Sequence, residues 1–540
     1  MGNQKEYPVR FTPRGLSDAW DSSMTFPGAC KRLTNLIFDQ SNPEMVRARP
    51  GVGTDLTTFA SFTNPTYISQ HTVLGNLVYG MVATGRFAGH DEPFCYDLKN
   101  NVFITITGPT AGNTPTTQPI SGDWTPPSMA VVGIKIIITH PGFNGVGANF
   151  FGVIDITNPA APTWTSANTA TNGLPSVPVW VVNYNNRAYF FLSNKAFYSD
   201  VLVPTTMTNA GQSLTMGDTT PIIGASGLPI ETASGGVVAS LIVFKQFQIW
   251  QITGDAAITG TLATNFLSLN VGATSAGTIV QTPIGTIFSG IDGPYYVSPL
   301  GQVLPLTKDN TKLAQDLQAP FQGMINVGRA VGSYTGSVYR ICMETVIEGV
   351  SQIADYWFDA TVRRWNGPHS FPYDCISPAG NYFVVSHRSK GAHLYKSQYL
   401  PDLTSVYNDD GTAISVFLEA SFLPKLQNIN VKDVIESTIE LTSTAQTTVY
   451  TITAIDERLT NMSTVLLNLN SPAAYWGAGG VWGGGSKWNS IVNNMYTYTI
   501  PWDTPLVFKK LMLTISAASS YSLAIGTIFI KFRDCGYTNI

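Results

Sequence analysis

Trp250-Gln-Ile-Thr-Gly-Asp255, Ile291-Asp-Gly-Pro-Tyr-Tyr296 and Trp357-Phe-Asp-Ala-Thr-Val-Arg-Arg-Trp-Asn-Gly367 are three turns that echo one another along the chain. Each turn follows an aromatic strand-like run, and units of roughly 40–60 residues that end in this way recur between residues 54 and 410. A repeat of this size holds about four short strands, which is the content of one propeller blade. The sequence therefore predicts a β-propeller of about six or seven blades. A pair of stacked β-sandwiches is the alternative that such weak repeats leave open.

Short β-branched and aromatic runs separated by Pro, Gly and Asn continue along the chain. Runs of about 4–8 such residues between turn residues are typical of strands. The clearest are Asn101–Thr107, Val131–Ile138, Val179–Val182, Ala188–Leu192, Val237–Phe244, Phe247–Ile252, Tyr295–Val297 and Tyr382–Val385. One stretch, Asp309–Leu317, predicts a helix, because a capping residue precedes Leu313 and Leu317 on one helical face. We therefore expect an all-β protein with little helix.

The composition indicates a folded chain with a large core. Of the 540 residues, 44% are hydrophobic and 11% aromatic, which argues against disorder although only 12% are charged. The net charge is −4, so we expect no large basic surface that grips DNA or anionic lipid. The start of the chain has no apolar signal-peptide region, and the longest apolar stretch, Met129–Thr139, is too short to span a membrane.

Three segments differ in character and predict three domains. Residues 1–50 carry 12 charges and few strand-like runs, so we expect an N-terminal docking arm. Residues 51–411 hold the propeller repeats. Residues 412–540 contain alternating strand-like runs, which predict a C-terminal β-sandwich.

The predicted sandwich contains one unusual stretch, Tyr475-Trp-Gly-Ala-Gly-Gly-Val-Trp-Gly-Gly-Gly-Ser-Lys-Trp488. Glycine weakens strands, so we expect a loop here. Two interpretations stay open for Trp476, Trp482 and Trp488. Their indoles pin the loop to the sandwich, or the loop is a mobile surface that contacts a partner or takes part in gating.

Residues that could hold a metal or cofactor do not fall into recognisable patterns. The five cysteines lie far apart and form no Cys-x-x-Cys pair, so we expect buried thiols in a reducing cytosol. The six histidines form no His-Glu-x-x-His motif, and His387 and His393 are too few to bind zinc alone. We predict no metal site and no cofactor.

Catalytic motifs are absent from the sequence as well. It contains no Gly-x-Ser-x-Gly elbow, no phosphate loop and no dinucleotide fingerprint. A glycosidase would use two carboxylates about 5–10 Å apart, and the candidates are Asp355 with Asp359, or Asp91 with Glu92. Acidic residues beside turns mostly accept backbone hydrogen bonds, so we predict no enzymatic activity.

The N-terminal segment resembles the opening of a known family. Its features are Gly15-Leu16, Phe26-Pro-Gly28, Asn35 before an apolar run and Arg49-Pro-Gly51. The other similar stretches are Asn186–Phe191 with Ser199-Asp200, Val243–Asp255, Ser289–Tyr296 and the terminal Trp-Gly repeats. Together these stretches resemble the tail nozzle proteins of short-tailed phages, also called tail tubular protein B or packaged-DNA stabilisation protein. The likeness is scattered over most of the chain, and the Trp-Gly-rich run has more glycine than that family pattern leads us to expect.

The resemblance implies a non-enzymatic virion protein that is made in the host cytoplasm and built into the tail. Its homohexamer would form a ring below the portal-adaptor ring, retain packaged DNA and conduct it at ejection. Tail fibre or spike proteins would attach to the propeller and sandwich. Double-stranded DNA would pass through the channel without specific binding.

Under this interpretation the basic residues of the first segment contact neighbouring subunits or the adaptor. They are Arg10, Arg14, Lys31, Arg32, Arg47 and Arg49. For Arg47 and Arg49 the alternative is an ordinary turn with two solvated charges, in which Pro50 restrains φ and Gly51 permits a positive φ.

A different function class also stays open: a carbohydrate-binding or carbohydrate-cleaving propeller that acts as a receptor-binding tail protein. Exposed Trp and Tyr side chains on propeller loops could stack on sugars. Particle symmetry separates the two classes, because a nozzle forms a six-fold ring whereas tail spikes are usually trimers.

Overall fold

The computed structural model describes residues 6–18, 28–87, 89–117, 126–145, 149–167, 173–209, 211–231, 237–256, 261–307, 317–347, 349–402, 405–420, 431–443, 447–470, 496–519 and 522–536. These residues are nearly all in strands and turns, with one four-residue α-helix, α1 (Ala319–Gln322), and the 3-10 turns η1 (Ala276–Thr278) and η2 (Val327–Arg329). The all-β prediction is confirmed. The helix predicted over Asp309–Leu317 lies outside the described residues except for Leu317.

The chain divides into two compact units. The propeller unit comprises Asp55–Asp355 and Phe371–Ser397. The terminal unit comprises Met1–Thr54, Tyr356–Ser370 and Gln398–Ile540. This division differs from the boundaries predicted at residues 50 and 411, because segments far apart in the sequence fold into the same unit.

The propeller unit holds six sheets, each with strands in sequential order, and only Gln398 at the end of the last strand falls outside it. The four-stranded sheets are β6 (Tyr67–Leu74), β7 (Leu77–Phe87), β8 (His90–Asp97), β9 (Val102–Ile104); β10 (Ser128–Val132), β11 (Lys135–Thr139), β12 (Phe151–Asp155), β13 (Thr163–Ala167); β14 (Trp180–Tyr184), β15 (Arg187–Leu192), β16 (Lys195–Tyr198), β17 (Ser213–Thr215); β18 (Gly224–Glu231), β19 (Val237–Phe244), β20 (Ile249–Thr253), β21 (Ala263–Ser268); and β22 (Val280–Thr282), β23 (Gly285–Ser289), β24 (Pro294–Val297), β25 (Val303–Pro305). The three-stranded sheet is β31 (Tyr373–Ala379), β32 (Tyr382–His387), β33 (Leu394–Gln398). A further group contains β26 (Met324–Ile325), β27 (Val331–Thr335), β28 (Val338–Ile347) and the first part of β29 (Val350–Asp359).

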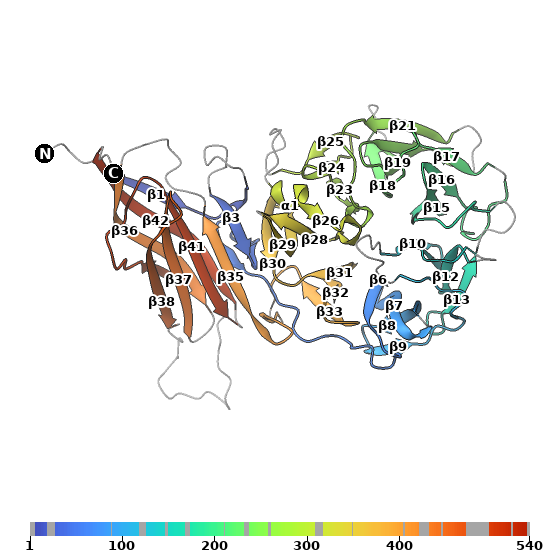
Figure 1. Ribbon diagram of the computed structural model, residues 1–540, viewed down its shortest axis with the longest axis horizontal. Coiled ribbons are helices and arrows are strands. Elements are labelled where there is room, and N and C mark those ends of the chain that lie inside the picture. The colour runs from blue at the N-terminus through green and yellow to red at the C-terminus, as the bar shows by residue number, and fades with distance from the viewer. Residues whose placement is uncertain are drawn as a thin grey trace. The chain divides into compact units, whose positions relative to one another are not determined.

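The innermost strands of these sheets form a closed ring, which Figure 1 shows face-on. Strands β6, β10, β14, β18, β22, β27 and β31 each contact the next, and β31 contacts β6 again. A closed ring leaves only short outer edges exposed, which is how a propeller protects its sheets. The predicted β-propeller is therefore confirmed.

The position of a strand in its blade decides how apolar the strand is. Ile136, Ile137 and Ile138 of β11 are all fully buried, because an inner blade strand is covered on both faces by neighbouring blades. This explains a continuous apolar run where a half-exposed strand would alternate. The hairpin between β10 and β11 turns at Gly133, whose φ of +61° favours glycine.

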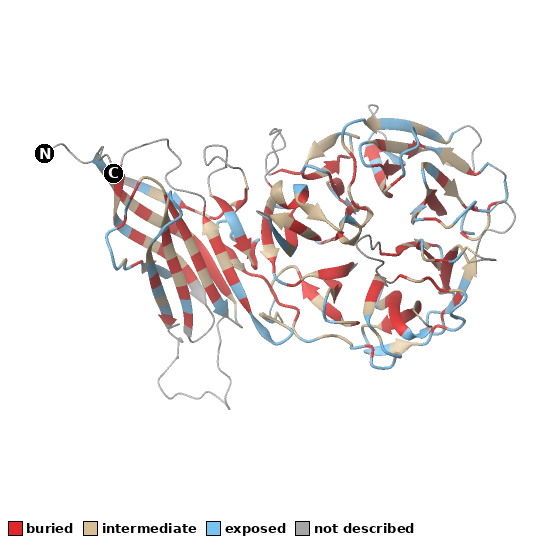
Figure 2. Ribbon diagram, in the orientation of Figure 1, coloured by how far each residue is buried: buried red, intermediate tan, exposed pale blue. Residues whose placement is uncertain are grey.

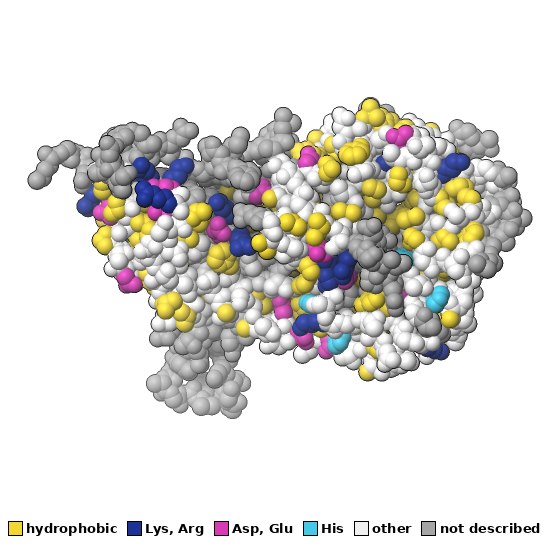
Figure 3. Space-filling view, in the orientation of Figure 1, with side chains coloured by type: hydrophobic (Ala, Val, Ile, Leu, Met, Phe, Trp, Pro, Cys, Tyr) yellow, Lys and Arg dark blue, Asp and Glu magenta, His cyan; other side chains and the backbone are white. Residues whose placement is uncertain are grey.

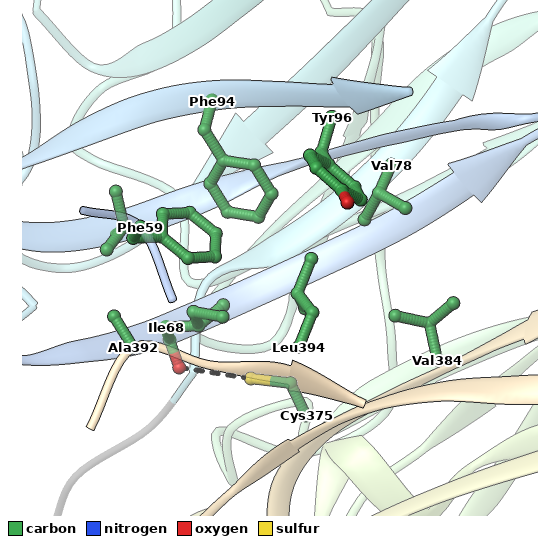
Figure 4. Close-up of a cluster of buried hydrophobic side chains, with 10 residues drawn as sticks. Phe59, Ile68, Val78, Phe94, Tyr96, Cys375, Val384, Ala392 and Leu394 are labelled. Atoms are coloured by element: carbon green, nitrogen blue, oxygen red, sulfur yellow. Dashed lines mark hydrogen bonds between the residues drawn. The ribbon is translucent and has the colours of Figure 1, made fainter. Parts of the chain in front are cut away.

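The ring closes where the β6 sheet meets the β31 sheet. Phe59, Ile68, Val78, Phe94, Tyr96, Cys375, Val384, Ala392 and Leu394 belong to the buried cluster drawn at this seam in Figure 4. The Cys375 thiol donates a hydrogen bond to the Ile68 carbonyl oxygen at 3.3 Å. The seam therefore joins the start and the end of the propeller by apolar packing and side-chain hydrogen bonds.

The terminal unit is built from two groups of paired strands. The first runs in the order β39 (Tyr496–Thr499), β36 (Val431–Ser443), β42 (Leu523–Gly536), β5 (Val46–Ala48) and β4 (Leu36–Phe38), with β1 (Glu6–Phe11) on β42 and β40 (Val507–Phe508) on β36. The second contains β30 (Arg364–His369), β3 (Ala29–Thr34), β35 (Thr412–Ala420), β41 (Leu511–Ser519), β37 (Thr447–Asp456) and β38 (Asn461–Asn470), with β2 (Gly15–Leu16) on β3 and β34 (Asn408–Asp409) on β35.

Figure 2 shows buried and more exposed residues alternating along the long strands of the terminal unit. On β35, Ile414, Val416 and Leu418 are buried, whereas Ser415 is exposed. This period of two means that one face of the sheet packs against a core and the other faces outward. The sandwich packing of the two groups stays a prediction.

The first 50 residues are part of these sheets. Strand β1 pairs with β42, and β3 pairs with β35, so the N-terminal segment contributes to both groups. The sequence shows few strand-like runs in this segment. In β3 the exposed Lys31 and Arg32 stand next to each other at the centre, so buried and exposed residues do not alternate regularly. Pairing with C-terminal strands, rather than local propensity, makes this segment β.

Candidate functional site

Arg49, predicted to reach a partner, lies in a buried network of the terminal unit. Its side chain is 2% exposed and forms an ion pair with Asp409 at 2.5 Å. The Nε group donates to the Asn35 amide oxygen at 2.9 Å, and Nη2 donates to the Ser370 hydroxyl at 3.2 Å. Asn35 in turn donates to the Ser415 carbonyl oxygen at 2.7 Å. The guanidinium thus ties together four segments of one chain.

Glycine is required at position 51 of the Arg-Pro-Gly motif because space is short there, and not because of its φ. A Cβ atom at Gly51 would lie 2.0 Å from the Asn408 carbonyl oxygen, and no positive φ is found there. The amide of Gly51 donates to the Val406 carbonyl oxygen at 2.7 Å. The amide of Gly53 donates to the Asn408 carbonyl oxygen at 3.0 Å. The predicted positive φ is wrong, because the glycine is required by the close approach of another backbone.

Arg47 is also engaged inside the chain. It forms an ion pair with Asp39, and its side chain is 13% exposed. Burial lowers the pKa of the Arg47 guanidinium. The alternative of two solvated charges is wrong, because both side chains are largely buried and have intrachain carboxylate partners. Their contact with a neighbouring subunit or adaptor stays a prediction.

The other four predicted basic residues lie nearer the surface of the terminal unit. Arg10, Lys31 and Arg32 are exposed. Arg14 is half-buried and lies 3.8 Å from the Glu44 carboxylate. The structure does not bring the six residues together into one cluster, so their role in subunit or adaptor contacts stays a prediction.

Trp476, Trp482 and Trp488, predicted to contact a partner or take part in gating, lie outside the described residues. Both interpretations of the Trp-Gly-rich stretch therefore stay predictions.

Asp91, one of the catalytic candidates, is fully buried in the propeller unit. Its carboxylate accepts hydrogen bonds from the hydroxyls of Ser69, at 2.6 Å, and Thr117. Burial raises the pKa of Asp91 to about 6, and the two hydroxyl donors partly offset this rise. The same residue's amide donates to the Pro115 carbonyl oxygen, so Asp91 holds the segment that leads towards the second blade.

Asp355 is the second buried carboxylate of the propeller unit. It forms an ion pair with Arg340 at 2.6 Å in which both side chains are 1% exposed. Tyr373 donates to its other oxygen at 2.8 Å, and Arg340 also donates to the Ser397 hydroxyl at 2.6 Å. Phe383 lies under the guanidinium, 5.2 Å from ring centroid to Cζ. Such a closed ion pair is structural, because its charges are satisfied before any substrate could bind.

The remaining acidic candidates also have intrachain partners. Glu92 accepts a 2.5 Å hydrogen bond from Arg86. Asp359, in the terminal unit, accepts backbone hydrogen bonds from Thr361 and Val362 in the turn after β29. Burial raises the pKa of Asp359. Asp359 fits the prediction that acidic residues beside turns accept backbone hydrogen bonds, whereas the partner of Glu92 is a side chain.

His71 is a buried residue of the propeller seam. The Ser377 hydroxyl donates to the His71 carbonyl oxygen at 2.7 Å and lies 2.8 Å from Nδ1 of the same residue. Because that hydroxyl's proton is already used, Nδ1–H is the donor to the Ser377 oxygen. Burial lowers the pKa of His71 to about 3, so the ring stays neutral near physiological pH.

Within the described part of the chain, no group of three His, Cys, Asp or Glu side chains could hold a metal ion. All five cysteines are free thiols, four of them buried and Cys535 exposed. Among the helices that the structure describes, none is long and apolar enough to cross a membrane.

The hollows among the described residues of the propeller unit include one of about 160 Å³ and one of about 520 Å³. The smaller, of about 160 Å³, is lined by innermost-strand residues that include Gln70, Ser128 and Trp180. The larger, of about 520 Å³, is an open groove whose lining includes Pro229 and Glu231. Figure 3 shows hydrophobic side chains scattered over the visible face of this unit, with few charged ones between them. Neither hollow brings together a pair of acidic side chains.

No family model matches the chain, and no curated protein matches it. Solved structures similar to it include a puromycin-hydrolysing peptidase of Mycobacterium tuberculosis, with 11% identity over 65% of this chain and 57% of that chain and a TM-score of 0.35. Another is the β-propeller domain of the Trilobed protease from Pyrococcus furiosus, with 9% identity over 63% and 99% and a TM-score of 0.32. A third is the exo-β-1,3-galactanase of Phanerochaete chrysosporium, with 11% identity over 90% and 100% and a TM-score of 0.26.

The chain covers 57%, 61% and 59% of the length of three hydrolase structures that it matches. At these identities and TM-scores, the likenesses carry no argument about activity, substrate or partner.

The buried networks were not predicted from the sequence. Arg49 and Asp409 are 360 residues apart, and Arg340 and Asp355 have no motif around them. The sequence indicates Asp91 only as one half of a candidate catalytic pair with Glu92. A single sequence contains no signal for such pairings, because they depend on strands that meet only in the folded chain.

Proposed function

We propose that this chain is a structural subunit of the tail nozzle of a short-tailed phage, with no enzymatic activity. The observation that carries the proposal is that its catalytic candidates are engaged within the fold. Asp91 and Asp355 are buried and hydrogen-bonded between strands, and Glu92 and Asp359 have partners of their own. The resemblance of the N-terminal segment supports the more specific assignment to the nozzle.

The proposed assembly is a homohexameric ring on the tail axis below the portal-adaptor ring. Tail fibre or spike proteins attach to it, and packaged double-stranded DNA is retained and later conducted through its channel. The protein is made in the host cytoplasm and ends in the virion tail.

Electron microscopy of the purified protein tests this proposal. We expect class averages of rings with six-fold symmetry and an open channel. Trimers, or particles without an axial channel, would contradict the nozzle assignment.

A sugar-binding propeller is the second candidate, and the open groove of about 520 Å³ is the observation that favours it. Its lining includes the polar side chains Glu231, Gln281 and Thr282 beside Leu228 and Val237. Apolar walls with a few polar groups are typical of small-ligand sites. A glycan array with the purified protein tests this candidate, and reproducible binding that Gln281→Ala removes would favour it over the nozzle.

A further inference from the structure

Strand β38 (Asn461–Asn470) lies at the end of its strand order and pairs only with β37 among the strands that the structure describes. One side-chain contact is found near its start, where the Thr504 hydroxyl lies 3.4 Å from the Met462 carbonyl oxygen. The outer edge of a ten-residue strand presents a row of backbone N–H and C=O groups. Such a row is a ready template for another strand.

Native proteins often protect such an edge with charged side chains or proline, and β38 carries neither. Its sequence, Asn-Met-Ser-Thr-Val-Leu-Leu-Asn-Leu-Asn, contains no charged residue and no proline. Leu466, near its middle, is 62% exposed, and Val449 on the adjacent β37 is 45% exposed. A long, uncharged and partly apolar edge is a site where strands of other chains pair.

The outward residues around β38 are also neutral, unlike those of the other strand group. Next to β38, Thr451 pairs with Ser516 and Thr453 with Thr464, which places uncharged side chains across three strands. On the other group, Glu6 pairs with Arg533 across β1 and β42, and Lys531 bonds Glu6 at 2.6 Å. A charge-paired surface is stable in water, whereas a neutral hydroxyl-rich one suits a hydrogen-bonded interface.

We propose that the outer edge of β38, which pairs with no further described strand, pairs with strand β39 of a neighbouring copy of this chain. In a cyclic ring each subunit presents two different surfaces, one to each neighbour. The proposal deepens the proposed function and rests on it, because the ring requires such a head-to-tail interface. Backbone hydrogen bonds would supply the affinity of this strand addition. The side chains that alternate along β38 would set its register.

The chain itself offers a matching strand for this edge. Strand β39 (Tyr496–Thr499) is an end strand of the first group, pairs only with β36 among the described strands, and contains no charge. Tyr496 on it is 42% exposed. At the other end of that order, all three residues of β4 are buried, so β4 is less available to a partner. Two neutral, exposed end strands on one subunit supply both halves of a repeating contact.

A charged substitution on the edge tests the proposal. In Leu466→Lys, a lysine is placed on an exposed position of the edge strand, where it protects natural edges from pairing. The matched control is Leu459→Lys, at a 67% exposed leucine in the turn between β37 and β38. Analytical ultracentrifugation gives the assembly state, and thermal unfolding confirms that both variants fold like the wild type.

We expect Leu466→Lys to weaken association about tenfold or more, and Leu459→Lys to leave it unchanged. Hydrogen exchange of the wild type should show slower exchange of 461–470 and 496–499 in the assembled form than in the dilute monomer. If Leu466→Lys unfolds, Thr464→Lys on the same face replaces it.

The outcomes separate this inference from the nozzle assignment. Intact six-fold rings of a folded Leu466→Lys protein overturn the β38 contact and leave the nozzle proposal standing. An assembly of another symmetry that Leu466→Lys dissolves overturns the nozzle and keeps the contact. A wild-type monomer at all concentrations, or protection of 461–470 that is equal in monomer and assembly, overturns the contact.

Discussion

Arg49 shows how one buried side chain can connect distant segments of a chain. Its guanidinium lies between Asn35, Ser370 and Asp409, which come from three separate stretches of sequence. Arginine suits this position because its planar fork bonds several acceptors at once. The terminal unit is therefore held together at a residue that the sequence places in an ordinary Arg-Pro-Gly turn.

Replacing this arginine should destabilise the terminal unit. In Arg49→Met the carboxylate of Asp409 loses its partner, and breaking a buried pair in this way costs about 3–5 kcal/mol. We expect the free energy of unfolding in urea to fall by about 3 kcal/mol. Arg10→Met, at an exposed arginine, is the control and should change it little. Equal effects of both variants would show that the network contributes nothing specific.

Asp91 makes the stability of the propeller dependent on pH. Its folded pKa of about 6 lies above the ordinary aspartate pKa of 3.8, so its contribution to stability is full below the unfolded pKa and is lost as pH rises through the folded pKa. We expect the wild-type melting temperature to fall between pH 5 and pH 7.5, and Asp91→Asn to reduce that fall. Differential scanning calorimetry across this range measures it. Asp97→Asn, at a carboxylate hydrogen-bonded in an exposed turn, is the control. A pH profile of Asp91→Asn identical to that of the wild type would exclude Asp91 as the source.

At the scale of elements, the closing contacts depend on backbones that come very near to each other. Gly51 and Gly53 bond Val406 and Asn408, and Gly53 forms an isolated parallel bridge with Asp409. These bonds connect the end of the N-terminal segment to β34. Side-chain size is therefore limited at this point by another strand's backbone, which cannot move aside.

Gly51→Ala tests this limit. A methyl group 2.0 Å from the Asn408 carbonyl oxygen forces the two segments apart, so we expect a loss of about 2–3 kcal/mol of stability. Gly112→Ala is the control, because the nearest atom to a Cβ there is 4.0 Å away. Chemical denaturation of the two variants measures the difference, and a neutral Gly51→Ala would mean that the segments can separate freely.

Deleting residues 1–50 tests whether the N-terminal strands are needed for the fold of the terminal unit. The sequence predicts that removing residues 1–50 abolishes attachment to the adaptor and leaves the propeller folded. The structure adds that strands β1 to β5 are lost from the terminal unit, whereas the propeller unit contains none of these residues. We therefore expect limited proteolysis with mass spectrometry to find a protected Asp55–Asp355 region and a cleaved C-terminal region.

The control for this deletion is a chain that lacks only residues 1–5, which leaves every described strand in place. A 1–50 deletion whose C-terminal strands stay protected would show that the N-terminal segment is a dispensable arm after all.

For the whole molecule, the net charge determines whether the proposed nozzle would attract or repel DNA. Residues 51–411 hold 15 basic and 21 acidic residues, and residues 412–540 hold eight of each. Two of the seven basic residues in the first 50, Arg47 and Arg49, are neutralised by intrachain carboxylates. In the proposed ring, six copies of a chain of net charge −4 would carry −24, which would repel phosphate groups.

We therefore expect the assembled protein to conduct duplex DNA without binding it. Affinity for DNA comes mostly from Lys and Arg that neutralise phosphates, and acidic residues outnumber basic ones over residues 51–411. A gel shift with short duplex DNA at about 150 mM salt should show no sub-micromolar complex. Tight binding with a steep salt dependence would instead indicate a basic channel surface that the net charge conceals.

The sequence by itself determined the all-β class and the propeller, because the period of short strands and the aromatic turns such as Trp250–Asp255 are local properties of the chain. It also indicated that no catalytic motif is present. Only the tertiary structure decided that residues 1–54 fold with 398–540, that Arg49 is buried against Asp409, and that Gly51 lacks room for a Cβ. The physical reason is distance along the chain. Pairings between strands that are hundreds of residues apart depend on which backbones meet after folding, and no local pattern around Arg49 or Asp409 records that meeting.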